Sequence, residues 1–142
     1  MLASEWDRLA EERHRQIVSG EDLSFEFVTV PATWRLFESA DPTLVLDIGS
    51  GTGDFTARLA RVAGSVIALE PSRTCVALAR RVCQTANNVR FVEASLEEAA
   101  SELYGQPVTA AVAVMTLMTA PDLHGFARAL APFCRTGGNL LP

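Results

Sequence analysis

Short apolar segments alternate with amphipathic segments over most of the chain, and this alternation predicts its elements. Apolar runs predict strands near residues 43–48, 65–70, 89–93, 108–114 and 138–141. Apolar residues three or four positions apart predict helices near 54–62, 72–85, 96–103 and 122–131. Strands that alternate with helices form a parallel sheet with helices on both faces. We therefore predict an α/β fold with three layers and a doubly wound, mostly parallel sheet.

The residues before the first predicted strand favour a helical extension. A helix is predicted over residues 4–18, with Ser4 as its cap and Asp7 at the capping-box position. One stripe of this helix consists of Trp6, Leu9, Arg13 and Ile17, with Ala10 beside it. A second helix is predicted from Pro31, which suits a first turn, to about Ser39. Aromatic residues of this extension either cover one face of the sheet or help to enclose a ligand.

Composition adds limits to this picture. A chain of 142 residues that is 49% hydrophobic and 20% charged predicts one globular domain over 1–142. Its parts are a helical cap (1–41) and a core (42–142). The net charge of −5 and the lack of basic clusters disfavour nucleic acid as a partner. Three cysteines without a Cys-x-x-Cys pattern, and only two histidines, predict reduced thiols and no metal site. With no apolar run long enough for a membrane span and no leader sequence, we expect a cytoplasmic protein.

Residues 45–53 carry the most specific pattern, Val-Leu-Asp-Ile-Gly-Ser-Gly-Thr-Gly. A buried strand, a glycine-rich turn and a helix N-terminus together predict a site for a nucleotide-like ligand. Dinucleotide-binding loops have Gly-x-Gly-x-x-Gly, but Asp54 stands here at the third glycine position. Asp47 and Asp54 would repel a pyrophosphate, and they favour a ligand that is cationic and has no phosphate. S-adenosylmethionine has these properties.

The motif resembles the first motif of the class I (Rossmann-like) S-adenosylmethionine-dependent methyltransferases, and the resemblance covers roughly residues 43–141. The family places an acid after the second strand to accept both ribose hydroxyls, and Glu70 matches it. Ser95 stands where many relatives have an aspartate that contacts the adenine. The resemblance therefore implies S-adenosylmethionine as the cofactor, with contacts from Asp47, Gly49, Ser50, Gly51, Gly53, Glu70, Pro71, Ser95, Leu96 and Met115.

The chain departs from the family pattern toward its C-terminus. Thr109 replaces an aspartate that often opens the fourth strand, and Thr136 replaces a proline in the turn before the fifth. The family's fold adds a helix and two antiparallel strands after the fifth strand, whereas this sequence stops at Pro142. We therefore expect a core truncated after its fifth strand, with an open sheet edge covered by a second copy in a homodimer or by a second subunit.

The resemblance implies methyl transfer to a small molecule or a peptide, because the acidic composition disfavours nucleic acid. No catalytic residue is assigned; His14 and His124 are candidates for a general base, and each is alternatively a surface residue. Met115, Leu117 and Met118 either line an acceptor pocket or belong to the core. Two other functions stay open: a non-catalytic cofactor-binding or partner subunit of a split methyltransferase, and a nicotinamide oxidoreductase, which Asp54 disfavours.

Overall fold

The centre of the molecule is a parallel sheet with the strand order β3-β2-β1-β4. The computed structural model describes residues 2–134. The strands span Leu44–Ile48 (β1), Ser65–Leu69 (β2), Val89–Val92 (β3) and Ala110–Val112 (β4). This arrangement confirms the predicted α/β fold. The predicted fifth strand, 138–141, lies outside the described residues.

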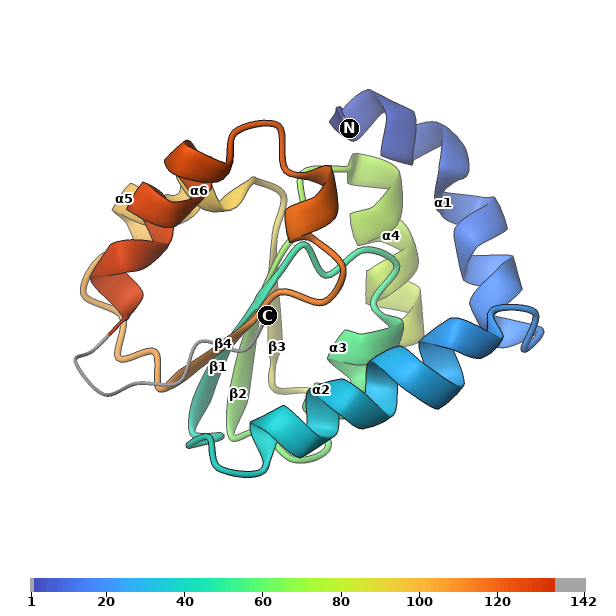
Figure 1. Ribbon diagram of the computed structural model, residues 1–142, viewed down its shortest axis with the longest axis horizontal. Coiled ribbons are helices and arrows are strands. Elements are labelled where there is room, and N and C mark those ends of the chain that lie inside the picture. The colour runs from blue at the N-terminus through green and yellow to red at the C-terminus, as the bar shows by residue number, and fades with distance from the viewer. Residues whose placement is uncertain (1, 135–142) are drawn as a thin grey trace.

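Helices cover both faces of the sheet, as Figure 1 shows. One face packs against α5 (Leu96–Leu103) and α6 (Leu123–Leu130), and the other against α2 (Val30–Phe37) and α3 (Asp54–Leu59). Helix α4 (Arg73–Val82) lies beside α3. Alternate strand residues enter opposite cores, because side chains of a strand point to its two faces in turn. In β1, for example, Val45 lies in one core, and Leu46 and Ile48 lie in the other.

Strand β4 is shorter than the predicted range of 108–114. Before it, the Thr109 hydroxyl accepts a hydrogen bond from the Leu44 amide at 2.9 Å, at the start of β1. After it, Met115 has a φ of 59°, which is incompatible with an extended strand. A 3-10 turn, η2 (Leu117–Thr119), follows.

Helix α1 (Ala3–Val18) packs on α4 and begins differently from the prediction. Leu2 is the N-cap, and its backbone N–H donates to the Glu5 carboxylate at 2.7 Å. The predicted cap at Ser4 with Asp7 is therefore wrong. The predicted stripe is wrong at Leu9, whose side chain is 46% exposed, because α1 turns Ala10 instead toward α4.

The second helical segment begins earlier than predicted, at Leu23 rather than at Pro31. Its middle part, η1 (Phe25–Thr29), is a π-helix in which the Val30 N–H donates to the Phe25 carbonyl, five residues back. Pro31 has no N–H to donate to the carbonyl four residues before it, so the wider turn suits this position. Helix α2 continues directly from η1.

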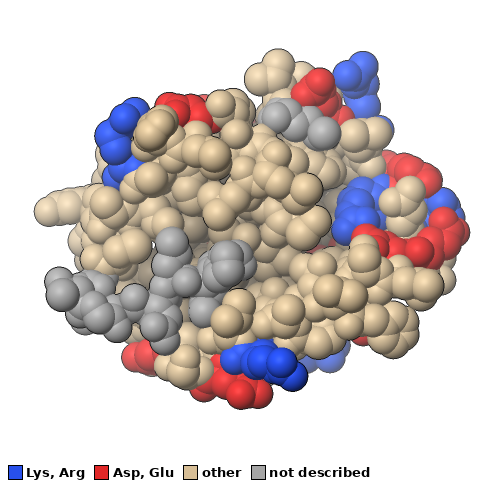
Figure 2. Space-filling model, viewed as in Figure 1, with Lys and Arg blue, Asp and Glu red and all other residues tan. Residues whose placement is uncertain are grey.

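Charged residues lie mainly at the rim of the face shown in Figure 2, and much of that face is uncharged. Acidic and basic side chains gather at the right of the view, where α1 lies in Figure 1. Within residues 2–134, no helix has the length and apolar character needed to span a membrane. The same residues hold no cluster of side chains suited to a metal ion.

Candidate functional site

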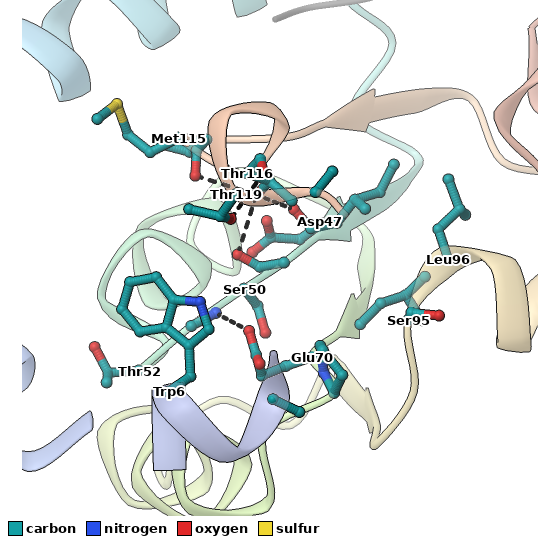
Figure 3. A pocket seen from close by; sticks show the side chains of 18 of the residues that line it. Trp6, Asp47, Ser50, Thr52, Glu70, Ser95, Leu96, Met115, Thr116 and Thr119 are labelled. Carbon is teal, nitrogen blue, oxygen red and sulfur yellow. Dashed lines mark hydrogen bonds between the residues drawn. The ribbon is translucent and has the colours of Figure 1, made fainter. Parts of the chain in front are cut away.

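A cavity of about 210 Å³ opens at the carboxyl ends of the parallel strands. This end of an open parallel sheet is the usual position for a ligand site. Most of its lining comes from α1, the glycine loop after β1, the end of β2, the start of α5 and the segment after β4, and η1, α3 and α6 add further residues. Figure 3 shows members of the first five segments, including Trp6, Ser50, Glu70, Ser95 and Thr116.

The glycine loop is held against the end of β2. The backbone N–H groups of Gly49 and Ser50 both donate to the carbonyl of Leu69, at 2.8 and 2.9 Å. Gly49, Gly51 and Gly53 have φ values of 69°, 55° and 85°, a region that residues with a side chain rarely adopt. The alternating glycines therefore allow a backbone path that other residues would strain.

The three glycines differ in what a side chain would meet. A Cβ at Gly49 would clash with the side chain of Thr116, and a Cβ at Gly53 would lie 2.7 Å from the Cα of Ala79 in α4. A Cβ at Gly51 would meet no atom within 4 Å. Gly49 and Gly53 thus allow close packing within the protein, whereas Gly51 leaves open space beside the cavity.

Glu70 directs its carboxylate at this loop and is 6% exposed. Its Oε2 accepts the Gly51 N–H at 2.9 Å, and its Oε1 accepts the Ser72 N–H at 2.8 Å. Each carboxylate oxygen has two lone pairs, so each keeps one for a hydroxyl of a ligand. Burial raises the pKa of Glu70 above its usual range, although the two backbone N–H groups oppose the rise.

Asp47 is the penultimate residue of β1, lines the cavity and is 2% exposed. The Thr56 hydroxyl donates to its Oδ2 at 2.7 Å. Burial raises the pKa of Asp47 to about 6; the bond from Thr56 opposes this rise, and the charge of Glu70 adds to it. Two buried carboxylates therefore lie in the same cavity, an arrangement that a cationic ligand would stabilise.

Two serines of the cavity differ in their partners. The Ser50 Oγ is buried and has no hydrogen-bond partner, which is uncommon for a buried hydroxyl and leaves it available to a ligand. The Ser95 Oγ accepts the Glu98 N–H at 3.3 Å, and the Ser95 N–H donates to the Glu98 carboxylate at 2.8 Å. Ser95 thus caps α5, and its hydroxyl keeps a proton and one lone pair for the cavity.

Helix α1 is tied to the turn that orients Glu70. The Asp7 carboxylate accepts the Ser72 hydroxyl at 2.6 Å and the Thr74 N–H at 3.0 Å. The bond from Ser72, followed by the one from Thr74, lowers the pKa of Asp7. Because the Ser72 N–H also donates to Glu70, one turn positions both the carboxylate and the helix that carries Trp6.

The structure brings nine of the ten predicted cofactor-contact residues to the cavity lining: Asp47, Gly49, Ser50, Gly51, Glu70, Pro71, Ser95, Leu96 and Met115. Gly53 is the exception. It is the N-cap of α3, and its Cα faces Ala79 of α4.

Neither candidate general base lines the cavity. The His14 Nδ1 lies 3.5 Å from the Asp54 Oδ1 in the contact between α1 and α3. His124 is exposed at the start of α6, where its N–H donates to Asp122 at 3.0 Å. A role as general base for either histidine therefore stays a prediction.

Several residues that line the cavity were not predicted from the sequence. Thr116 donates to the Ile48 carbonyl at 2.8 Å, joining the segment after β4 to the end of β1. Thr119 and Phe126 also line the cavity. So do Arg13 and Phe25, from α1 and η1. Arg13 is a basic residue within the apolar stripe of a predicted helix, and this local signal could have identified it.

Comparison with known proteins adds a family and a set of similar structures. A family described as a methyltransferase domain matches residues 45–138. The biotin biosynthesis bifunctional protein BioHC of Cellvibrio japonicus is 42% identical over 65 residues, which cover 40% of this chain and 13% of that protein.

Two solved structures extend the comparison to the fold. A DhpI–SAM–HEP complex matches 95% of this chain and 60% of its own, with 25% identity and a TM-score of 0.71. A SAM-dependent methyltransferase of Thiobacillus denitrificans, in complex with S-adenosyl-L-homocysteine, matches 73% of this chain and 42% of its own, with 25% identity and a TM-score of 0.56. The chain thus spans less than two thirds of the length of these relatives.

Proposed function

The chain belongs to the methyltransferase domain family, and on this premise we propose that it binds S-adenosylmethionine in the cavity and transfers its methyl group to an acceptor. Two similar proteins were solved with SAM or S-adenosyl-L-homocysteine. The cavity of this chain has features that suit the same cofactor.

One observation carries the proposal: the buried carboxylate of Glu70 is fixed at the cavity by two backbone N–H groups, 2.9 and 2.8 Å away. A carboxylate oriented in this way can accept both hydroxyls of a ribose, one on each oxygen. The unpartnered Ser50 Oγ and the open space beside Gly51 support a ligand on the same wall.

The other lining residues suit the rest of the cofactor. Asp47 and Glu70 favour its positive charges, since their own burial is costly without a cation. Ser95 and Leu96, at the start of α5, would contact the adenine. The cofactor supplies an activated methyl group, so the main task of the protein is to hold donor and acceptor in line.

The acceptor proposed here is a small molecule or a peptide. We assign the acceptor to the side of the cavity formed by the segment after β4, where Met115, Thr116 and Thr119 form an uncharged wall. The net charge of −5 and the largely uncharged face in Figure 2 favour such an acceptor over a polyanion. We also propose a cytoplasmic location and a homodimer.

A nicotinamide oxidoreductase is the alternative that the site disfavours. The lining carries carboxylates at Asp47, Asp54 and Glu70 around the loop where a pyrophosphate would lie. A non-catalytic cofactor-binding subunit would have the same cavity, so only a transfer assay separates it from an enzyme.

Calorimetric titrations of separate aliquots of one sample, one with S-adenosylmethionine and one with NADH, test the proposal. We expect S-adenosylmethionine to bind with a micromolar dissociation constant, about −7 to −8 kcal/mol, and NADH to give no saturable heat. Binding of NADH with the higher affinity would contradict the proposal. Binding of S-adenosylmethionine without transfer to any acceptor would favour the non-catalytic subunit.

A further inference from the structure

The charges of the cavity lining are strongly unequal. Among the described lining residues, carboxylates are supplied by Asp47, Asp54, Glu70 and Glu97, and Arg13 is the sole cation. The cofactor has two positive groups, the sulfonium and the amino group, and one negative group, the carboxylate. The carboxylates of the lining can pair with the two positive groups of the cofactor. Arg13 can pair with its one negative group.

Arg13 lies at the opposite end of the cavity from the turn that holds Glu70. Near the start of α1, Asp7 is bonded to Ser72 of that turn. About two turns further on, His14 lies 3.5 Å from Asp54 at the start of α3. Seven residues of helix span about 10 Å. The cavity therefore extends along α1, with Glu70 toward one end and Arg13 toward the other.

The guanidinium of Arg13 is held in place before any ligand arrives. Its Nη1 donates to the Asp22 carboxylate, and its Cζ lies 5.8 Å from the centre of the Phe25 ring, which also lines the cavity. A guanidinium has five N–H donors in a fixed fork, so the bond to Asp22 leaves donors for a ligand. The side chain is 31% exposed, and a ligand can reach it.

We propose that Arg13 binds the carboxylate of the cofactor's amino-acid end and so determines how that end lies beneath α1. This inference rests on the proposed cofactor. Glu70 would hold the ribose at one end, and a bidentate pair between guanidinium and carboxylate would fix the other. Arg13 is thus assigned as a positioning residue that selects ligands carrying a carboxylate.

The test compares two ligands that differ only at the inferred contact. Decarboxylated S-adenosylmethionine keeps the adenosine, the sulfonium and the amino group but lacks the carboxylate. The affinity of each ligand is measured by calorimetry for the wild-type chain, Arg13→Leu and Arg13→Lys. Arg8→Leu is the matched control, because Arg8 is exposed on the same helix and does not line the cavity.

We expect Arg13→Leu to lower the affinity for S-adenosylmethionine at least tenfold and the affinity for decarboxylated S-adenosylmethionine less than twofold. Arg13→Lys should give an intermediate loss, since it keeps the charge but not the fork. Arg8→Leu should change neither affinity. Equal loss for both ligands would mean that Arg13 only supports the fold of α1 and η1, and no loss for either would also overturn the inference. If the wild-type chain binds neither ligand, the proposed function itself is wrong and the inference falls with it.

Discussion

At the residue scale, Gly51 is the loop position where a side chain would enter open space rather than protein. Gly51→Val should abolish cofactor binding and leave the domain folded, because the added methyl groups would occupy the space beside the cavity. Gly20 is a matched control: it also has a positive φ, 75°, and open space around its Cα, but it does not line the cavity. Calorimetry with circular dichroism measures both effects. Normal binding by Gly51→Val would exclude the loop as the cofactor site.

Asp47 makes cofactor binding dependent on pH. Its pKa of about 6 in the folded protein means that protonation competes with a cationic ligand below about pH 6. We expect affinity to fall as the pH drops through 6, and binding at pH 6 to release protons. Titrations at pH 6 in two buffers of different ionisation enthalpy measure the release, which Asp47→Asn should reduce. Heats that do not depend on the buffer would contradict this prediction.

The Asp47 carboxyl affects the free energy of unfolding with the opposite pH dependence to cofactor binding. A raised pKa means that the folded chain holds the proton more tightly than the unfolded chain does. The contribution of Asp47 to the free energy of unfolding is therefore full below about pH 4 and is lost as the pH rises through about 6.

Single residues also show what the sequence could and could not reveal. Asp47 and Glu70 were predicted because each ends a recognisable strand, and parallel strands end at one edge. Asp7 was assigned to a local cap, but its partners Ser72 and Thr74 are 65 and 67 residues away. A contact at that separation leaves no periodic pattern in the sequence.

At the scale of elements, Asp7 joins α1 to the turn after β2 through two hydrogen bonds. Asp7→Ala would leave the Ser72 hydroxyl and the Thr74 N–H without their acceptor. We expect faster hydrogen exchange in α1 and unchanged exchange in β1, measured by mass spectrometry.

Glu11→Ala is the control for that experiment, since the Glu11 carboxylate is exposed and lies 3.8 Å from an equally exposed Arg81. Its exchange should match the wild type. Equal exchange in Asp7→Ala and wild type would mean that apolar contacts of Ala10 and Trp6 with α4 are enough to hold the helix.

The strands, and the helices after β1, were predicted well from the sequence. The N-terminal segment was predicted less well. Strands that are buried on both faces have continuous runs of apolar residues, so their pattern in the sequence is strong. The π-helix at Phe25–Thr29 has no such signature, because it arises from the missing N–H of Pro31 within a longer helix.

At the scale of the whole molecule, the proposed homodimer concerns the edge of the sheet. The edge predicted to pair with a second copy is that of the fifth strand, 138–141, which lies outside the described residues. Edge strands tend to be covered, and a two-fold axis would pair two such edges. We expect light scattering after gel filtration to give twice the chain mass of 15.3 kDa. A monomer at high concentration, with full transfer activity, would contradict the dimer.

Titration of Glu70→Ala with the demethylated product, S-adenosylhomocysteine, tests whether Glu70 binds the ribose of the cofactor. The wild-type chain should bind with a micromolar dissociation constant. The variant should lose about 1.5–3 kcal/mol, roughly 10- to 150-fold in affinity, because the lost acceptor is charged. Glu93→Ala, at an exposed acid after β3, should bind like the wild type. An unchanged affinity in Glu70→Ala would mean that Glu70 does not bind the ribose.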